Sequence, residues 1–286
     1  ALAVIFKKPL DVGGPVGLSA TANIFLGQVE APLLVRPYLA TMSKNELLIL
    51  MTVGMSTIAG SVMVIYTTML APIYGLGLIG HFLTASLISV PAAIMYANMM
   101  IPSDTKTDFP ADDSSKMYSS TVDAITRGTK SGIDIFLNVA AMLIVVMALV
   151  FLINAMLGVF PDIQGQPLTM ERIVGWIFAP LAWCMGIPWQ ESQAAGELLG
   201  IKTILNEFVA YIYLADTSTY VLSEKSSLIM LYALCGFANF SSVGILLSGM
   251  SAMVPERRED LIAVSVKALW AALLASCMTG FIVGIL

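Results

Sequence analysis

Hydrophobic stretches of two lengths follow one another along the chain. The long stretches can each cross a bilayer as a helix, which takes about 20 residues; they cover residues 46–70, 74–100, 132–157, 227–252 and 261–286. The short stretches come in pairs, at 15–26 with 30–41 and at 188–203 with 207–214. The chain lacks the alternating segments that are typical of a membrane β-barrel. The pattern therefore predicts an all-α integral membrane protein.

Each pair of short stretches is interpreted as a re-entrant hairpin, which enters the membrane and returns to the same side. Polar residues stand at both turns: Gln28 and Glu30 in the first pair, Asn206 and Glu207 in the second. A carboxylate at membrane depth costs roughly 3 kcal/mol or more unless it is paired or hydrated. We therefore expect the two tips to line a binding site. The alternative for Glu30 is the end of a juxtamembrane helix that simply faces water.

The same order of elements occurs twice, with weak identity between the copies. Secondary transporters build a midplane site from such inverted repeats and from discontinuous helices. The predicted first repeat is 11–100, with hairpin 13–41 and spans 46–70 and 74–100, and a polar connection follows at 101–131. The predicted second repeat, 132–286, comprises span 132–157, an interfacial helix 170–186, hairpin 188–215 and spans 227–252 and 261–286.

Counting the crossings places the two hairpins on opposite faces of the membrane. Of the 14 lysines and arginines, most fall on the side of the first hairpin. Only Arg172, Lys202 and Lys225 fall on the other side, and Lys267 lies within the last span. An excess of basic residues marks the cytoplasmic side, so we place the first hairpin there.

Two spans have polar centres. Residues 55–61 are small and hydroxyl-rich, which fits either close helix packing or an unwound break whose carbonyls face a site. Residues 239–242 stand at the matching place in the second repeat. The side chains at membrane depth are thus acids, amides and hydroxyls, without an arginine at either tip. This set suits a neutral, polyhydroxylated or amide-bearing solute and a coupling cation, with apolar surface from Val62, Phe208 and Phe237.

Composition supports the membrane assignment and narrows the chemistry. Charged residues make up 12% and mean hydropathy is +0.86, whereas a soluble domain has about 25% charged residues. Net charge is −5 without a basic tract, which argues against a nucleic-acid partner. We interpret His81 as a packing residue and Cys184, Cys235 and Cys277 as core side chains. The chain has no nucleophile–base pair or phosphate loop, so we expect neither an enzyme nor an organic cofactor.

Three motifs closely resemble the concentrative nucleoside transporter family. They are GQVEAPLL at 27–34 with RPYL at 36–39, NEFVAY at 206–211 and FANFSSVG at 237–244. The resemblance covers essentially the whole chain in the right order. Members have additional N-terminal spans, so the chain is identified as a bacterial member that is truncated at its N-terminus.

The resemblance implies a sodium-coupled symporter that imports nucleosides across the cytoplasmic (inner) membrane, as a homotrimer with elevator-type movement. Proton coupling is the first alternative; an uncoupled channel or receptor-like protein and an intramembrane enzyme are others. The implied substrate contacts are Gln28, Val29, Glu30 and Val62 around the base and Glu207, Phe237, Asn239 and Ser242 around the ribose. The implied sodium site is Asn23, the Leu26 carbonyl, Thr57 and the Ile58 carbonyl.

One departure from the family concerns base selectivity. Many members have Thr where this chain has Val29, between the glutamine and the glutamate of the first tip. The change removes a hydroxyl from the site. Thr57, where some members have Ser, keeps the hydroxyl and is compatible with sodium.

Overall fold

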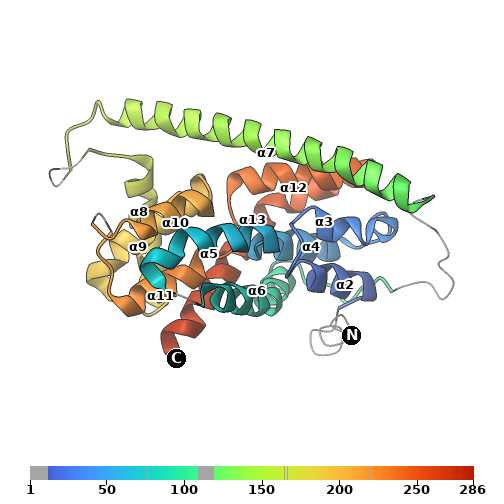
Figure 1. Cartoon of the computed structure of the whole chain (residues 1–286), viewed down its shortest axis with the longest axis horizontal. Coiled ribbons are helices and arrows are strands. Elements are labelled where there is room, and N and C mark those ends of the chain that lie inside the picture. Colours follow the sequence, from blue (N-terminus) through green and yellow to red (C-terminus); the bar gives the residue numbers. More distant parts are fainter. Residues whose placement is uncertain (1–11, 76, 109–118, 164, 166, 219) are drawn as a thin grey trace.

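The computed structural model describes residues 12–75, 77–108, 119–163, 165, 167–218 and 220–286. All regular elements in these ranges are helices, as the sequence predicts (Figure 1). They are α2 (Gly14–Ala22), α3 (Glu30–Leu33), η1 (Arg36–Tyr38), α4 (Lys44–Ser56), α5 (Gly60–Tyr74), α6 (Leu78–Met100), α7 (Thr121–Leu157), α8 (Met170–Cys184), α9 (Trp189–Ile204), α10 (Glu207–Ala215), α11 (Glu224–Ala233), α12 (Phe240–Met253), η2 (Pro255–Arg257) and α13 (Arg258–Ile285).

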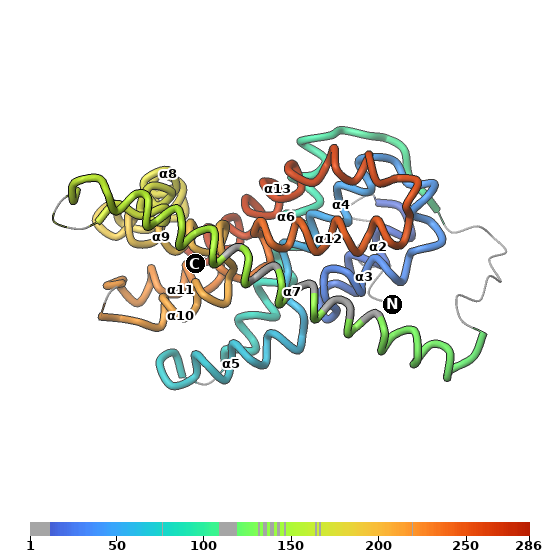
Figure 2. Tube along the Cα trace, turned by 90° about the horizontal axis from the view of Figure 1, so that it is seen from above, coloured from blue at the N-terminus to red at the C-terminus, as the bar shows by residue number. Residues whose placement is uncertain are grey.

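Three helical segments of the described chain are long and apolar enough to cross a membrane: Lys44–Tyr74, Leu78–Met100 and Pro255–Ile285. The helix α7 begins well before the predicted span at 132. Its start is fixed by Ser120, whose Oγ accepts a hydrogen bond from the Asp123 amide at 3.1 Å, as an N-cap residue does. The helix runs along the whole length of the molecule and passes over α12 (Figure 2).

The polar centre of the first span is an unwound break, which decides between the two interpretations of residues 55–61. The helix α4 ends at Ser56 and α5 begins at Gly60, while Thr57 and Ala59 have extended backbone. The predicted span at 227–252 is broken in the same way, between α11 and α12. Gly236, in the second break, has φ of 131°, and a Cβ there would lie 2.7 Å from the carbonyl oxygen of Ser56. The two breaks therefore touch backbone to backbone.

The two hairpins lie towards opposite ends of the long axis, and their tips point to the middle (Figure 1). The first hairpin consists of α2, the turn at residues 23–29, and a return arm made of α3 and η1. That arm is not one helix, because Pro37, at the start of η1, lacks the amide that a continuous helix would need there. The second hairpin consists of α9 and α10, joined directly at Leu205 and Asn206.

The helix α13 lies at the centre of the fold. It packs against α4, α6 and α11. Its buried face is rich in small side chains, which let helix backbones approach closely; these include Ala268, Ala271, Ala272, Ala275, Ser276 and Gly280. The same helix thus holds elements from both halves of the chain around the tips.

One end of the molecule gathers the end of the first hairpin, the start of α4 and the start of α13. Lys44 Nζ lies 2.9 Å from Asp260 Oδ1. Arg257 donates to the carbonyls of Ala40 at 2.9 Å and Met42 at 2.7 Å. Glu46 accepts hydrogen bonds from the amide and hydroxyl of Thr107 at 2.7 and 2.9 Å. These contacts hold the three segments together at this end of the molecule; the side of the membrane on which they lie stays a prediction.

Candidate functional site

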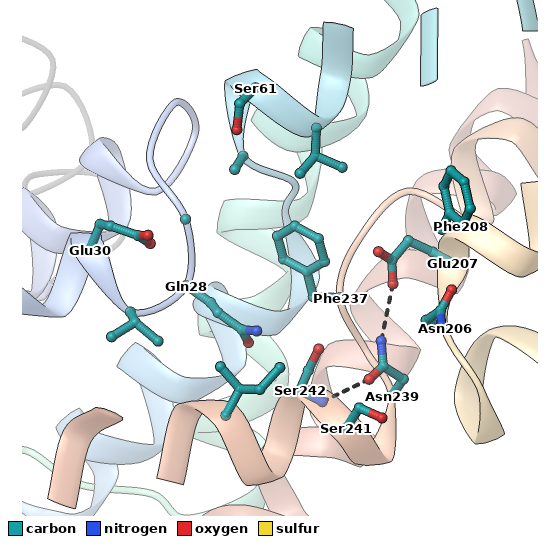
Figure 3. Close-up of a pocket in the computed structure, with 15 residues that line it drawn as sticks. Gln28, Glu30, Ser61, Asn206, Glu207, Phe208, Phe237, Asn239, Ser241 and Ser242 are labelled. Carbon is teal, nitrogen blue, oxygen red and sulfur yellow. Dashed lines mark hydrogen bonds between the residues drawn. The ribbon is translucent and has the colours of Figure 1, made fainter. Parts of the chain in front are cut away.

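A cavity of about 330 Å³ lies where the two tips meet the two helix breaks (Figure 3). It is lined by Gly27, Gln28, Val29, Glu30, Ala59, Ser61, Val62, Asn206, Glu207, Phe208, Phe237, Asn239, Ser241, Ser242 and Ile245. All the residues that the resemblance assigns to substrate are in this lining. The two carboxylates stand at opposite ends of the cavity, with Gln28 and Phe237 between them (Figure 3).

The Glu207 carboxylate is the most constrained group of the site. It is 5% exposed and belongs to the first turn of α10. Its Oε2 accepts a hydrogen bond from Asn239 Nδ2 at 3.0 Å (Figure 3). Its Oε1 accepts one from the Tyr66 hydroxyl at 2.7 Å. Each carboxylate oxygen therefore has one donor from a different helix.

The two asparagines of the site are helix caps. Asn206 Oδ1 accepts from the Val209 amide at 2.9 Å, and Asn239 Oδ1 accepts from the Ser242 amide at 2.7 Å. These bonds fix the amides and direct the starts of α10 and α12 to the cavity. The positive end of a helix dipole stabilises negative charge. The starts of these two helices therefore add positive dipole ends to a lining that contains no arginine.

The first tip is less constrained. Gln28 is 8% exposed, and its Oε1 is buried without a hydrogen-bond partner. Val29 is buried, whereas Glu30 is exposed and its carboxylate folds back over Gly27. A buried acceptor without a partner costs free energy, so the orientation of Gln28 suits a ligand that donates to it. Glu30 faces both the cavity and the surface.

Tyr66 is a site residue that the sequence-based prediction missed. It is 2% exposed and packs against Tyr211 with ring centroids 4.9 Å apart. In the sequence Tyr66 lies among mostly apolar residues, and that pattern predicts a packing role. Its only signal is its spacing, because a residue four positions after Val62 lies on the same helix face. Ser61 and Ser241, which also line the cavity, were likewise not singled out.

Two of the residues assigned to sodium, Asn23 and Thr57, are in contact beside the first tip. Asn23 Nδ2 donates to Thr57 Oγ1 at 2.9 Å and to the Val53 carbonyl at 2.8 Å, and Thr57 Oγ1 donates to the Asn23 carbonyl at 3.1 Å. Asn23, Thr57 and Ile58 are buried, while the side chain of Leu26 is half exposed. Asn23 Oδ1 is buried without a partner. A buried oxygen without a partner, close to the backbone carbonyls of Asn23 and Val53, suits a cation that prefers oxygen ligands.

The histidine and the cysteines are not among the residues that line the cavity. His81 Nδ1 lies 2.9 Å from the Tyr232 hydroxyl, which fits a packing role. Cys235 and Cys277 are buried as expected, whereas Cys184 is exposed, so its assignment to the core was wrong. Among the described residues, no group of three or more His, Cys, Asp and Glu side chains lies close enough to hold a metal ion.

Comparison with known proteins connects this site to a family. Residues 81–284 match the family described as Na+ dependent nucleoside transporter C-terminus. The chain is 40% identical to an uncharacterized transporter of Haemophilus influenzae, covering 98% of this chain and 67% of the relative. It is 36% identical to the nucleoside permease NupC of Helicobacter pylori, covering 98% and 66%. The chain thus spans about two thirds of the length of these relatives.

A solved structure with a similar fold points to the same family as the sequence relatives. CNTnw in an inward-facing substrate-bound state superposes with a TM-score of 0.83 at 35% identity, covering 99% of this chain and 67% of the other. Bacterial relatives and apolar helices together make this a multi-pass protein of the inner membrane. The family comprises transporters rather than enzymes. The family match over most of the chain, the 40% identity and the shared fold establish that the chain belongs to the sodium-dependent nucleoside transporters.

Proposed function

We propose that the protein imports nucleosides by symport with sodium, and that the cavity between the two tips is the nucleoside site. The observation that carries the proposal is the Glu207 carboxylate, which is buried in a small cavity and held by one donor on each oxygen. A carboxylate has about four lone-pair positions. The two that Tyr66 and Asn239 leave can accept from the neighbouring hydroxyls of a ribose.

The rest of the lining suits the other parts of a nucleoside. Ser242, 4% exposed, lies at the ribose end beside Asn239. Gln28 and Glu30 offer an amide and a carboxylate to the edge of a base, and Val29, Val62 and Phe237 supply apolar surface. The volume of about 330 Å³ is at the small end of the range of ligand pockets, roughly 300 to 1,000 Å³. The cavity therefore suits one small solute.

The sodium assignment rests on Asn23 and Thr57, with the carbonyls of Leu26 and Ile58. The unpaired Asn23 Oδ1 supports it, and the family description names sodium dependence. Proton coupling is the second candidate, because the exposed Glu30 at the cavity could carry a proton.

An elevator movement and a homotrimer complete the proposal. The helix α7 supports them because many of its side chains are exposed and apolar, among them Phe136, Ile144 and Phe151. Such a helix needs lipid or neighbouring subunits to cover it. It would form the static frame past which the two hairpins move.

The test is uptake by proteoliposomes that contain the full-length protein. Uridine uptake should require an inward sodium gradient and should fail when choline replaces sodium. Uptake that ignores sodium and follows a pH gradient would instead support proton coupling.

The ribose contact is tested by Glu207→Gln. This variant should weaken binding of uridine far more than binding of uracil, because only uridine carries the ribose that Glu207 is proposed to hold. Glu224→Gln removes an exposed acid at the start of α11 and should change neither. Equal weakening of uridine and uracil by Glu207→Gln would remove Glu207 from the ribose site.

A further inference from the structure

The two broken spans have the same spacing from cap to cap. Ser43 is the N-cap of α4, and Ala59 is the N-cap of α5 sixteen residues later. Ser223 is the N-cap of α11, and Asn239 is the N-cap of α12 after the same interval. Positions counted from Ser43 and from Ser223 can therefore be compared between the two halves of the chain.

Each hairpin is joined to its broken span by a hydrogen bond at the same position. Asn23, at the end of α2, donates through Nδ2 to the Val53 carbonyl at 2.8 Å. Lys202, in the last turn of α9, donates through Nζ to the Ala233 carbonyl at 2.8 Å. Val53 and Ala233 each lie ten residues after the N-cap of their helix. The two contacts are therefore equivalent, although one donor is an amide and the other is an ammonium group.

The two contacts differ in charge. Asn23 and Lys202 are 2% and 0% exposed. Asn23 is neutral, and its Oδ1 is buried without a partner in the place where sodium is proposed to bind. Lysine is almost never fully buried unless it is paired, and the carbonyls at the C-terminal end of a helix attract a cation. At the second break, the positive charge thus belongs to the chain itself.

We infer that the ammonium group of Lys202 is a built-in cation, which holds the second hairpin on α11 at the place where an added sodium ion is proposed to act in the first half of the chain. The inference rests on the proposed sodium site beside Asn23, because it compares the two breaks. The first hairpin is held firmly on α4 only while sodium is bound. The second hairpin is held on α11 at every step, with or without sodium. Lys202 is thus a positioning residue for the break that carries Phe237 and Asn239.

The first test needs no variant. Hydrogen exchange of the purified full-length protein is measured in sodium and again with choline in place of sodium, because exchange reports local opening. An ion present at a hundred times its Kd suppresses the opening that releases it by about a hundredfold. Amides at the end of α2 should therefore lose up to about a hundredfold in protection without sodium, whereas those at the end of α9 should keep theirs.

The exchange result separates two failures. Equal loss of protection at the ends of α2 and α9 would overturn the inference, because the second hairpin would then depend on sodium as the first does. Loss at neither end would contradict the proposed sodium site, and with it the comparison of the two breaks. This measurement decides the inference even if no Lys202 variant folds.

The second test asks whether the charge of Lys202 matters beyond its hydrogen bond. Lys202→Gln keeps a donor for the Ala233 carbonyl but removes the charge, and Lys202→Arg keeps the charge. The readout is the slope of log Kd for uridine against log sodium concentration below saturation, which counts the sodium ions taken up with uridine. An uncharged second break offers carbonyl and amide oxygens to sodium. Lys202→Gln should therefore raise the slope by up to about one ion relative to the wild type, and Lys202→Arg should not.

The matched control is Lys225→Gln, which removes an exposed lysine from the start of α11 and should leave the slope unchanged. A Lys202→Gln protein that binds uridine with the slope of the wild type would overturn the inference, because the hydrogen bond alone would then be sufficient. A rise of the same size in Lys202→Arg would overturn it as well, since that variant keeps the positive charge.

Discussion

Tyr66→Phe tests whether the Glu207 carboxylate must be held in place to recognise ribose. The substitution removes only the hydroxyl that donates to Glu207 Oε1 at 2.7 Å. The ring stays packed, because its neighbours Phe82 and Tyr211, with centroids 6.2 and 4.9 Å away, contact the ring itself. A hydrogen bond to a charged group contributes about 1.5 to 3 kcal/mol.

Only part of that contribution appears in binding, because the bond is already present without substrate. We expect a loss of about 1 to 2 kcal/mol in binding free energy, which is roughly a 5- to 30-fold increase in the Kd for uridine. Uracil, which lacks the ribose, should bind as in the wild type. The assay is calorimetric or thermal-shift titration of the full-length protein at fixed sodium.

The matched control is Tyr74→Phe, which makes the same change on the same helix. Tyr74 donates to the Leu214 carbonyl at 3.3 Å and does not contact Glu207. It should leave the Kd for uridine unchanged. The reasoning is refuted if both variants weaken uridine equally, or if Tyr66→Phe weakens uracil as much as uridine.

Two further predictions concern the breaks and the cation. Gly236→Ala should lower Tm and abolish uridine uptake, because the positive φ costs about 1 to 3 kcal/mol and the new Cβ meets the Ser56 backbone. The control is Gly80→Ala, which has open space around the new Cβ. An equal Tm for the two variants would contradict this prediction. Asn23→Ala should raise the sodium concentration for half-maximal uptake at least about tenfold by removing one ligand; an unchanged sodium dependence would remove Asn23 from the cation site.

The main features of the fold could be predicted because they follow from local sequence. The lengths of the apolar stretches separate spans from hairpin arms. The start of α9 is placed by Pro188, and the start of α10 by Asn206, whose side chain caps it. The residues that the resemblance assigns to substrate all line the cavity; apart from Val62, each lies inside one of the short motifs that carry the resemblance. In each case the signal is contained in a few consecutive residues.

The features that could not be predicted depend on contacts between distant segments. Residues 55–61 suit packing as well as unwinding, and the close approach of Gly236 to Ser56 is visible only once these distant segments are assembled. The contact of Tyr66 with Glu207 has the same origin, as 141 residues separate them. For Lys202, the sequence indicated only a basic residue on one side of the membrane. In the fold its side chain is buried and donates to the Ala233 carbonyl of α11, which comes later in the chain.

The end of α4 connects the three parts of the site and so offers a physical route for coupling. Thr57 bonds to Asn23 of the cation group. Gly54, one turn earlier, lies against Gln28 of the base end, since a Cβ there would be 3.3 Å from Gln28 Cβ. Ser56 touches Gly236 in the break that leads to Asn239 at the ribose end. Under the proposed sodium assignment, a cation that orders residues 56–58 would therefore stabilise both ends of the cavity at once. Because coupling between two ligands is reciprocal, a nucleoside bound at the proposed site would tighten cation binding by the same factor, and we expect the two to bind and leave together.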